Sequence, residues 1–115
     1  MKKFNRIKGM IGEEQAIKFL KKKKYKILER NYKNKVGEID IIALDKKTLV
    51  FVEVKERETL AFGRPSEAVD ERKQHKIRKT TTLYLIENDL YEKCEIRFDV
   101  IEILGDQISH IENAF

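Results

Sequence analysis

The sequence has little of what exported, membrane-spanning or low-complexity proteins use. It contains a single cysteine, Cys94, which permits no internal disulfide and suits a reducing cytoplasm. No apolar run approaches the roughly 20 residues that a membrane-spanning helix requires. One proline and five glycines among 115 residues argue against a long disordered segment. We therefore expect a soluble, globular, cytoplasmic protein.

The chain also lacks several short motifs that mark catalytic sites. It has no glycine-rich phosphate loop and no nucleophile-elbow sequence. Its two histidines, His75 and His110, are isolated and lack the ligand spacing of a zinc site. The first residues are basic, as in a signal peptide, but Lys8, Glu13 and Glu14 interrupt any apolar segment behind them. We therefore expect no export signal.

Positive charge is concentrated in the first third of the chain. Residues 1–35 hold 13 lysines and arginines against 3 acidic residues, whereas the remaining 80 residues carry a net charge of −5. Four of these lysines are consecutive: Lys21, Lys22, Lys23 and Lys24. A basic block beside a more acidic body is typical of polyanion binding. The lysine run would equally complement the dipole at a helix end, so charge alone leaves both interpretations open.

Two apolar runs joined by a short polar connection predict a β-hairpin. The runs cover residues 39–44 and 49–54, and the connection 45–48 is turn-like. If the turn is centred on Lys46 and Lys47, residues whose numbers sum to 93 face each other. Both runs are almost continuously apolar, which predicts strands that are covered on both faces of a sheet.

This register places two carboxylates opposite each other. Asp40 faces Glu53, and Glu38 faces Lys55. Directly opposed side chains have Cβ atoms only ~4.5–5.5 Å apart, and like charges there destabilise a sheet. A divalent cation such as Mg²⁺ would remove this cost, because hard cations take carboxylate oxygens as ligands.

The position of Lys55 allows two interpretations. Lys55 lies two residues beyond Glu53, hence on the same face of its strand. There it would position an attacking water or stabilise the transition state of phosphodiester cleavage. The simpler alternative is a salt bridge between Lys55 and Glu38.

The periodicity of apolar residues predicts an α/β domain of one mixed sheet with helices on it. The predicted elements are a helix over residues 5–23, strands over 25–33, 39–44 and 49–54, a helix from Pro65 or Ser66 to about Asn88, and strands over 94–104 and 107–111. The order is thus α-β-β-β-α-β-β. A helical crossover before the fourth strand favours a parallel return, which makes the sheet mixed.

Each predicted helix carries a charged residue on its apolar side. Glu13 falls between Ile17 and Leu20 on the helical wheel, although Glu14 is not cleanly separated from that side. Lys73 interrupts the inward stripe of the second helix. A partly exposed glutamate at the boundary and a lysine that extends to the surface are the alternatives to functional roles.

Several separate motifs, in order and over nearly the whole chain, resemble the YraN-like family of small bacterial proteins. The central motifs are Gly37-Glu38-Ile39-Asp40 and Phe51-Val52-Glu53-Val54-Lys55-x-Arg57. The others are Gly12-Glu13-x-x-Ala16, Arg30-Asn31, Phe62-Gly63-x-Pro65, Lys73 and Arg97-Phe98-Asp99. That family resembles archaeal Holliday junction resolvases in the PD-(D/E)XK superfamily of restriction-endonuclease-like proteins, whose core has the order α-β-β-β-α-β. Ile39 stands where the superfamily name has proline, and it only shapes the turn into the strand.

The resemblance implies a fold and an activity. It implies a single restriction-endonuclease-like domain over residues 1–115, and a metal-dependent endonuclease that hydrolyses phosphodiester bonds of DNA at branched or damaged sites. The implied catalytic residues are Asp40, Glu53 and Lys55, with Glu13, Asp40 and Glu53 as ligands of Mg²⁺ or Mn²⁺ and Lys73 as an auxiliary basic group. The residues expected to contact DNA phosphates are Arg57, Arg64, Lys21, Lys22, Lys23 and Lys24. Because related resolvases are symmetric dimers, the resemblance also implies a homodimer.

Two other functions stay open. A non-catalytic nucleic-acid-binding protein that retains the nuclease fold would bind DNA in a salt-dependent way without cutting it. A protein-interaction module would use the apolar loop Leu60-Ala61-Phe62 against a partner and would bind neither DNA nor metal.

Overall fold

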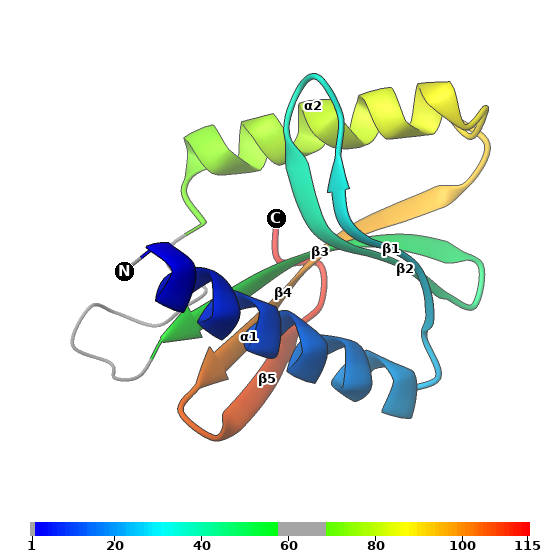
Figure 1. Ribbon diagram of the computed structural model, residues 1–115. Helices are drawn as coiled ribbons and strands as arrows, with labels where there is room; N and C mark the ends of the chain where they lie inside the picture. The colour runs from blue at the N-terminus through cyan, green and yellow to red at the C-terminus, as the bar shows by residue number, and fades with distance from the viewer. Residues whose placement is uncertain (1, 58–68) are drawn as a thin grey trace.

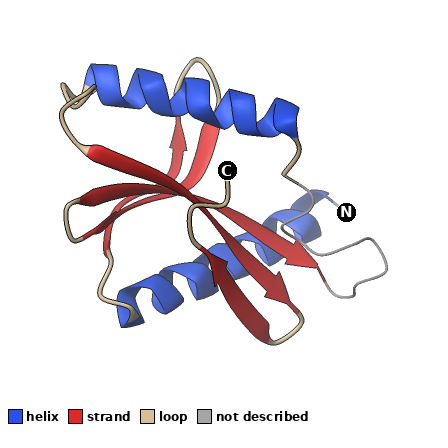
Figure 2. Cartoon of the chain, turned by 180° about the vertical axis from the view of Figure 1, so that it is seen from behind, coloured by secondary structure: helices blue, strands red, loops and turns tan. Residues whose placement is uncertain are grey.

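A sheet with one helix on each face makes up the described part of the chain (Figures 1 and 2). The computed structural model describes the backbone of residues 2–57 and 69–115, and side chains from residue 11 onward. The elements are α1 (Lys2–Lys22), β1 (Lys26–Lys33), β2 (Glu38–Asp45), β3 (Thr48–Arg57), α2 (Glu71–Glu87), β4 (Glu95–Leu104) and β5 (Gln107–Ile111). This order confirms the predicted α-β-β-β-α-β-β arrangement. Neither described helix is long and apolar enough to cross a membrane.

Within the described residues the sheet has five strands in the order β1-β2-β3-β4-β5. The pair β3–β4 is parallel, and the pairs β1–β2, β2–β3 and β4–β5 are antiparallel. The connection through α2 brings β4 back in the direction of β3, as expected for a long helical crossover. The predicted α/β fold with a mixed sheet is therefore confirmed.

The register of the central hairpin follows the predicted pairing. The β2–β3 ladder runs from Ile41 opposite Val52 to Asp45 opposite Thr48, so the facing residue numbers sum to 93. Glu38, however, lies opposite Lys33 of β1, and the two side chains form an exposed ion pair at 3.8 Å. The predicted pairing of Glu38 with Lys55 is therefore wrong. The β2–β3 ladder does not reach Glu38, whereas the β1–β2 ladder includes it.

Both faces of the sheet are buried, which accounts for the nearly continuous apolar runs of the two central strands. On one face the buried residues are Ala16, Ile17 and Leu20 of α1 with Ile41, Ala43, Val50 and Val52. On the other face they are Ile77, Tyr84 and Leu85 of α2 with Ile42, Leu49, Phe51 and Phe98. Figure 2 shows the two helices on opposite sides of the strands.

The second helix begins later than predicted. Asp70 is its N-cap residue: the backbone is extended there, and the carboxylate accepts the backbone N–H of Lys73 at 2.9 Å. Aspartate is among the strongest N-cap residues, so the helix starts at Glu71. A start at Pro65 or Ser66 is wrong, because the described residues just before Glu71 are not helical. Pro65 and Ser66 themselves lie outside the described residues.

A buried carboxylate fastens several elements together. Asp99 of β4 is 0% exposed, and it binds Nε of Arg97 at 2.9 Å and Nε2 of His110 in β5 at 2.6 Å. Arg97 also reaches the hydroxyl of Tyr25 at 2.7 Å and the carboxylate of Asp45 at 3.2 Å. Burial alone would raise the pKa of Asp99, but the hydrogen bonds from His110 and Arg97 outweigh it and hold that pKa below its usual range. This network gives the Arg97-Phe98-Asp99 motif a structural role.

We expect Asp99→Asn to destabilise the protein by about 3 kcal/mol near neutral pH, because it leaves Arg97 without its buried counter-charge. Since the folded-state pKa of Asp99 is lowered, its stabilisation is fully present above about pH 4 and is lost as the pH falls through the lowered value. The stability gap between wild type and variant should therefore shrink in acid. Urea unfolding across the pH range, with Asp106→Asn in the exposed β4–β5 turn as control, measures it. A gap that does not change with pH would contradict this account.

Candidate active site

Glu53 is a buried acid that two lysines approach. Its side chain is 9% exposed and lies on the face of β3 that α2 covers. Nζ of Lys73 is 2.6 Å from Oε1 of Glu53, and Nζ of Lys55 is 3.3 Å from the same oxygen. A buried carboxylate is tolerated only when it is paired. The two ammonium groups therefore compensate for the burial of Glu53.

Lys73 points from α2 to the sheet. Its side chain is 41% exposed, but its Nζ is bound to Glu53, so the alternative of a lysine extending only to solvent is wrong. Burial alone would lower the pKa of Lys73, but its hydrogen bonds with Glu53 and Lys55 outweigh this and raise it. For Lys55, burial and the hydrogen bond with Lys73 lower the pKa. Of the two lysines, Lys55 thus gives up its proton more readily.

Asp40 lies beside Glu53, as the hairpin register predicts. Oδ2 of Asp40 accepts the backbone N–H of Val54 at 2.8 Å, just beyond the last paired residues of the β2–β3 ladder. Burial, followed by the negative charge of Glu53, raises the pKa of Asp40 to about 7. The charge of Glu13 acts in the same direction. Asp40 is therefore close enough to interact electrostatically with one acid of β3 and one of α1.

The structure also separates Glu13 from Glu14, which the helical wheel does not. Glu14 forms an ion pair with Arg30 of β1 at 2.6 Å. Glu13 is half-buried, and its negative charge helps to raise the pKa of Asp40. Of the two glutamates, Glu13 is therefore the one on the side of the candidate site.

The donor set of this site suits a hard divalent cation. Asp40 and Glu53 offer carboxylate oxygens, which Mg²⁺ and Mn²⁺ prefer, and the raised pKa of Asp40 reflects a negative charge that lacks sufficient compensation. Two features work against a strong site. In residues 11–57 and 69–115, no group of three or more acidic, histidine or cysteine side chains is placed to hold a metal. In addition, Lys73 and Lys55 already contact Oε1 of Glu53. Asp40 and Glu53 would thus hold a cation as a pair, with water or substrate completing its shell.

Not all of the predicted phosphate contacts lie near these acids. Arg57 ends β3, two residues beyond Lys55. The run Lys21–Lys24 ends α1, on the face of the sheet opposite to Glu53 and about 14 Å along the helix axis from Glu13 (Figure 1). The structure therefore does not bring this run to the candidate site. Arg64 and the loop Leu60-Ala61-Phe62 lie outside the described residues.

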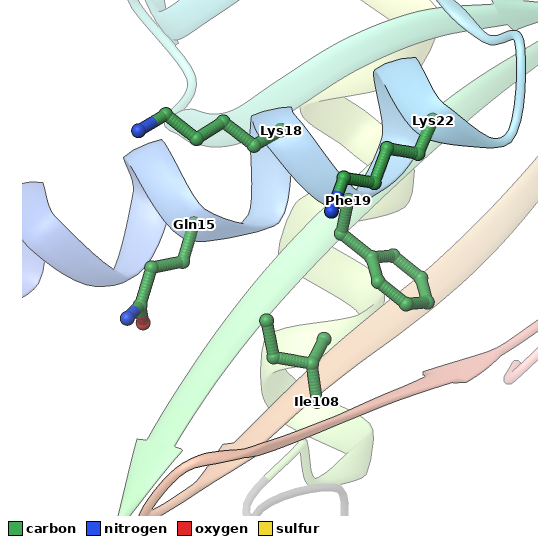
Figure 3. Close-up of a pocket in the computed structure, with 5 residues that line it drawn as sticks. All are labelled: Gln15, Lys18, Phe19, Lys22 and Ile108. Carbon is green, nitrogen blue, oxygen red and sulfur yellow. The ribbon is translucent and has the colours of Figure 1, made fainter.

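A hollow of about 210 Å³ between α1 and β5 is separate from the candidate site. It is lined by Gln15, Lys18, Phe19, Lys22 and Ile108 (Figure 3). The Phe19 ring and the Ile108 side chain form its apolar part. Neither Asp40 nor Glu53 is among its lining residues.

The sequence analysis missed a second basic region on α2. Residues 72–79 hold five lysines and arginines, one histidine and no acidic residue. The five basic residues stand in the sequence as a dense group, but the positive excess of residues 1–35 is larger. It also missed that Lys55 and Lys73 share one carboxylate, because they are separated by a helical crossover.

The fold and site define an α/β protein with an acid–lysine cluster on its central strand. A model of the family described as "Uncharacterised protein family UPF0102" matches residues 12–103, and the chain belongs to this family. A UPF0102 protein of Persephonella marina is 46% identical over 112 residues, covering 97% of this chain and 96% of that protein. A UPF0102 protein of Alkaliphilus oremlandii is 50% identical, covering 93% and 96%. One from Caldanaerobacter subterraneus is 47% identical over the whole of both chains. The resemblance to the YraN-like family is confirmed.

We expect Asp40→Asn to stabilise the protein in the presence of a chelator, increasingly so as the pH rises. Because the folded-state pKa of Asp40 is about 7, well above its ordinary value, ionising it costs stability as the pH rises from about 4 through 7. Asparagine does not ionise and can still accept the Val54 N–H. Urea unfolding at acidic and neutral pH measures the difference, with Asp106→Asn as control. Equal pH profiles for wild type and Asp40→Asn would show that the Asp40 charge is already compensated.

Proposed function

We propose that the protein is a metal-dependent nuclease that hydrolyses phosphodiester bonds of DNA. The observation that carries this proposal is the convergence of two carboxylates, Asp40 and Glu53, with two lysines beside the C-terminal half of β3. A cation bound to the carboxylates would lower the pKa of a water ligand and neutralise charge on the phosphate. The proposal includes the restriction-endonuclease-like character of the fold and a cytoplasmic location.

The two lysines are suited to different tasks. The lowered pKa of Lys55 fits a group that orients the attacking water and takes up its proton. The raised pKa of Lys73 keeps its positive charge near the acids, where it balances Glu53 and offsets negative charge on a bound phosphate. A branched or damaged DNA substrate and a symmetric homodimer are the finer parts of this proposal, and they rest on the resemblance to junction resolvases.

Two observations favour a second candidate, a non-catalytic nucleic-acid-binding protein. Both lysines contact Oε1 of Glu53, so this acid is compensated from within the chain. The described residues also provide no cluster of three metal-binding side chains. A protein that had exchanged metal binding for an internal ion pair would have these features.

Cleavage assays test the nuclease directly. With Mg²⁺ or Mn²⁺, the wild type should cut plasmid or four-way junction DNA. Asp40→Asn and Lys55→Ala should each reduce the rate by at least about 100-fold, since each removes a group that acts on the attacking water or the phosphate. The control is Lys47→Ala, which removes an exposed lysine of the β2–β3 turn and should leave the rate within about twofold. Metal-dependent cutting that survives both substitutions equally would exclude this site.

Metal binding separates the two candidates without an activity assay. A ligand that binds only the folded state stabilises it by about 2.7 kcal/mol at 100 times its dissociation constant. Mg²⁺ or Mn²⁺ should therefore raise the melting temperature of the wild type and not that of Asp40→Asn. If the metal has no effect on the wild type while Asp40→Asn is the more stable protein, the non-catalytic candidate is favoured.

A further inference from the structure

A concave basic surface lies between α2 and the turn that joins β1 to β2. This α2 groove has a volume of about 320 Å³ and is lined by Val36, Arg72, His75, Lys76 and Lys79. Figures 1 and 2 both show the turn rising beside α2. Four of the five lining residues are basic types, spaced so that they share one side of the helix. The groove therefore offers positive charge in a hollow of defined shape.

The wall opposite the helix is held in place by Asn34. Its Nδ2 donates to the backbone carbonyl of Thr80 in α2 at 3.2 Å, and its Oδ1 accepts the backbone N–H groups of Val36 and Gly37. A Cβ atom at Gly37 would lie only 2.7 Å from Oγ1 of Thr80. Glycine thus permits a close approach of the turn to the helix. Because these contacts are internal to the protein, the groove is formed before any ligand binds.

The charges of the groove are not balanced by the described part of the chain. Arg72, Lys76 and Lys79 are exposed, and none of them forms an ion pair with a described residue. Lys73, on the adjoining side of the helix, is instead paired with Glu53. Like charges three or four residues apart on a helix repel each other. An anion in the groove would relieve that repulsion.

The groove begins next to the candidate active site. Arg72 directly precedes Lys73, and Lys79 lies about 10 Å further along the helix axis. One strand of duplex DNA carries a phosphate per about 3.4 Å of helix axis, so this length corresponds to roughly three phosphates. Four of the groove's five lining residues are basic types, and their charged ends favour an anionic ligand over an apolar peptide.

We propose that the α2 groove binds the phosphodiester backbone of a nucleic acid. One part of this proposal rests on the proposed function: the groove holds the nucleic-acid strand whose continuation reaches Asp40 and Glu53. Backbone binding itself requires no metal and no cleavage. Contacts of this kind fix the position of the nucleic acid without reading its bases. The groove, and not the lysine run of α1, is then the main phosphate-binding surface.

Matched charge-removing variants test the proposal in EDTA. The groove variant is Arg72→Gln/Lys76→Gln/Lys79→Gln. Two controls remove the same charge elsewhere: Lys26→Gln/Lys46→Gln/Lys47→Gln near the β2–β3 turn, and Lys21→Gln/Lys22→Gln/Lys24→Gln at the end of α1. All nine side chains are exposed. Affinity for a labelled four-way junction, duplex DNA and duplex RNA is measured by fluorescence anisotropy at several salt concentrations.

We expect the groove variant to bind at least about 30-fold more weakly at 0.1 M salt, and its slope of log K against log salt to be smaller by about 2 to 3. The two controls should each lose less than about threefold. The charge-retaining variant Arg72→Lys/Lys76→Arg/Lys79→Arg should bind as the wild type does. If the groove variant melts at a lower temperature, the single variant Lys79→Gln replaces it, with an expected slope change of about 0.9.

Three results would overturn the proposal: equal losses in the groove variant and either control, absence of nucleic-acid binding in the wild type, or a groove variant that loses only binding to anionic phospholipid vesicles. The same variants separate the groove from the nuclease. Cleavage by a groove variant that binds normally would refute the groove alone. Weakened binding by the groove variant, with no cleavage by the wild type under either metal, would refute the nuclease alone.

Discussion

The ion pair between Glu53 and Lys73 joins the central strand to the second helix, and the candidate site depends on it. A carboxylate so deeply buried requires a counter-charge, and α2 supplies it from its first turn. The N-cap Asp70 binds the backbone N–H of the same Lys73, so the helix start and the ion pair fix each other. Burial is the first cause of the lowered pKa of Lys55 and of the raised pKa of Asp40, and the closeness of Lys55 to Lys73 and of Asp40 to Glu53 acts in the same direction.

Local patterns in the sequence were sufficient for the sheet and for the two facing acids. The apolar runs and the turn between them set the hairpin register, and that register alone brings Asp40 to Glu53. The partner of Lys73 could not be read in this way, because it depends on how a crossover helix packs on the sheet. The sequence could not distinguish Glu13 from Glu14 for the same reason. The ion pair of Glu14 with Arg30 depends on how α1 packs beside β1.

The motifs that carry the family resemblance serve two different purposes in the structure. Those around Asp40 and Glu53 form a charged cluster that is costly to maintain and is suited to chemistry. The Arg97-Phe98-Asp99 motif instead lies in the β4–β5 half of the sheet, where Asp99 and its partners connect β5 and the start of β1 to β4. In this chain, a charged motif is therefore not by itself a sign of a catalytic role. Only the surroundings of each acid distinguish the two cases.

The turn held by Asn34 has a mechanical consequence. This turn forms one wall of the α2 groove and leads directly into β2, which carries Asp40. The helix α2 forms the other wall of the groove and also carries Lys73, which binds Glu53. Because the Asn34 side chain ties this turn to the backbone of the helix, the groove and the acids belong to one stiff frame. If the groove holds a nucleic-acid strand as proposed, this frame would fix the distance from the bound strand to the two acids, whatever the base sequence.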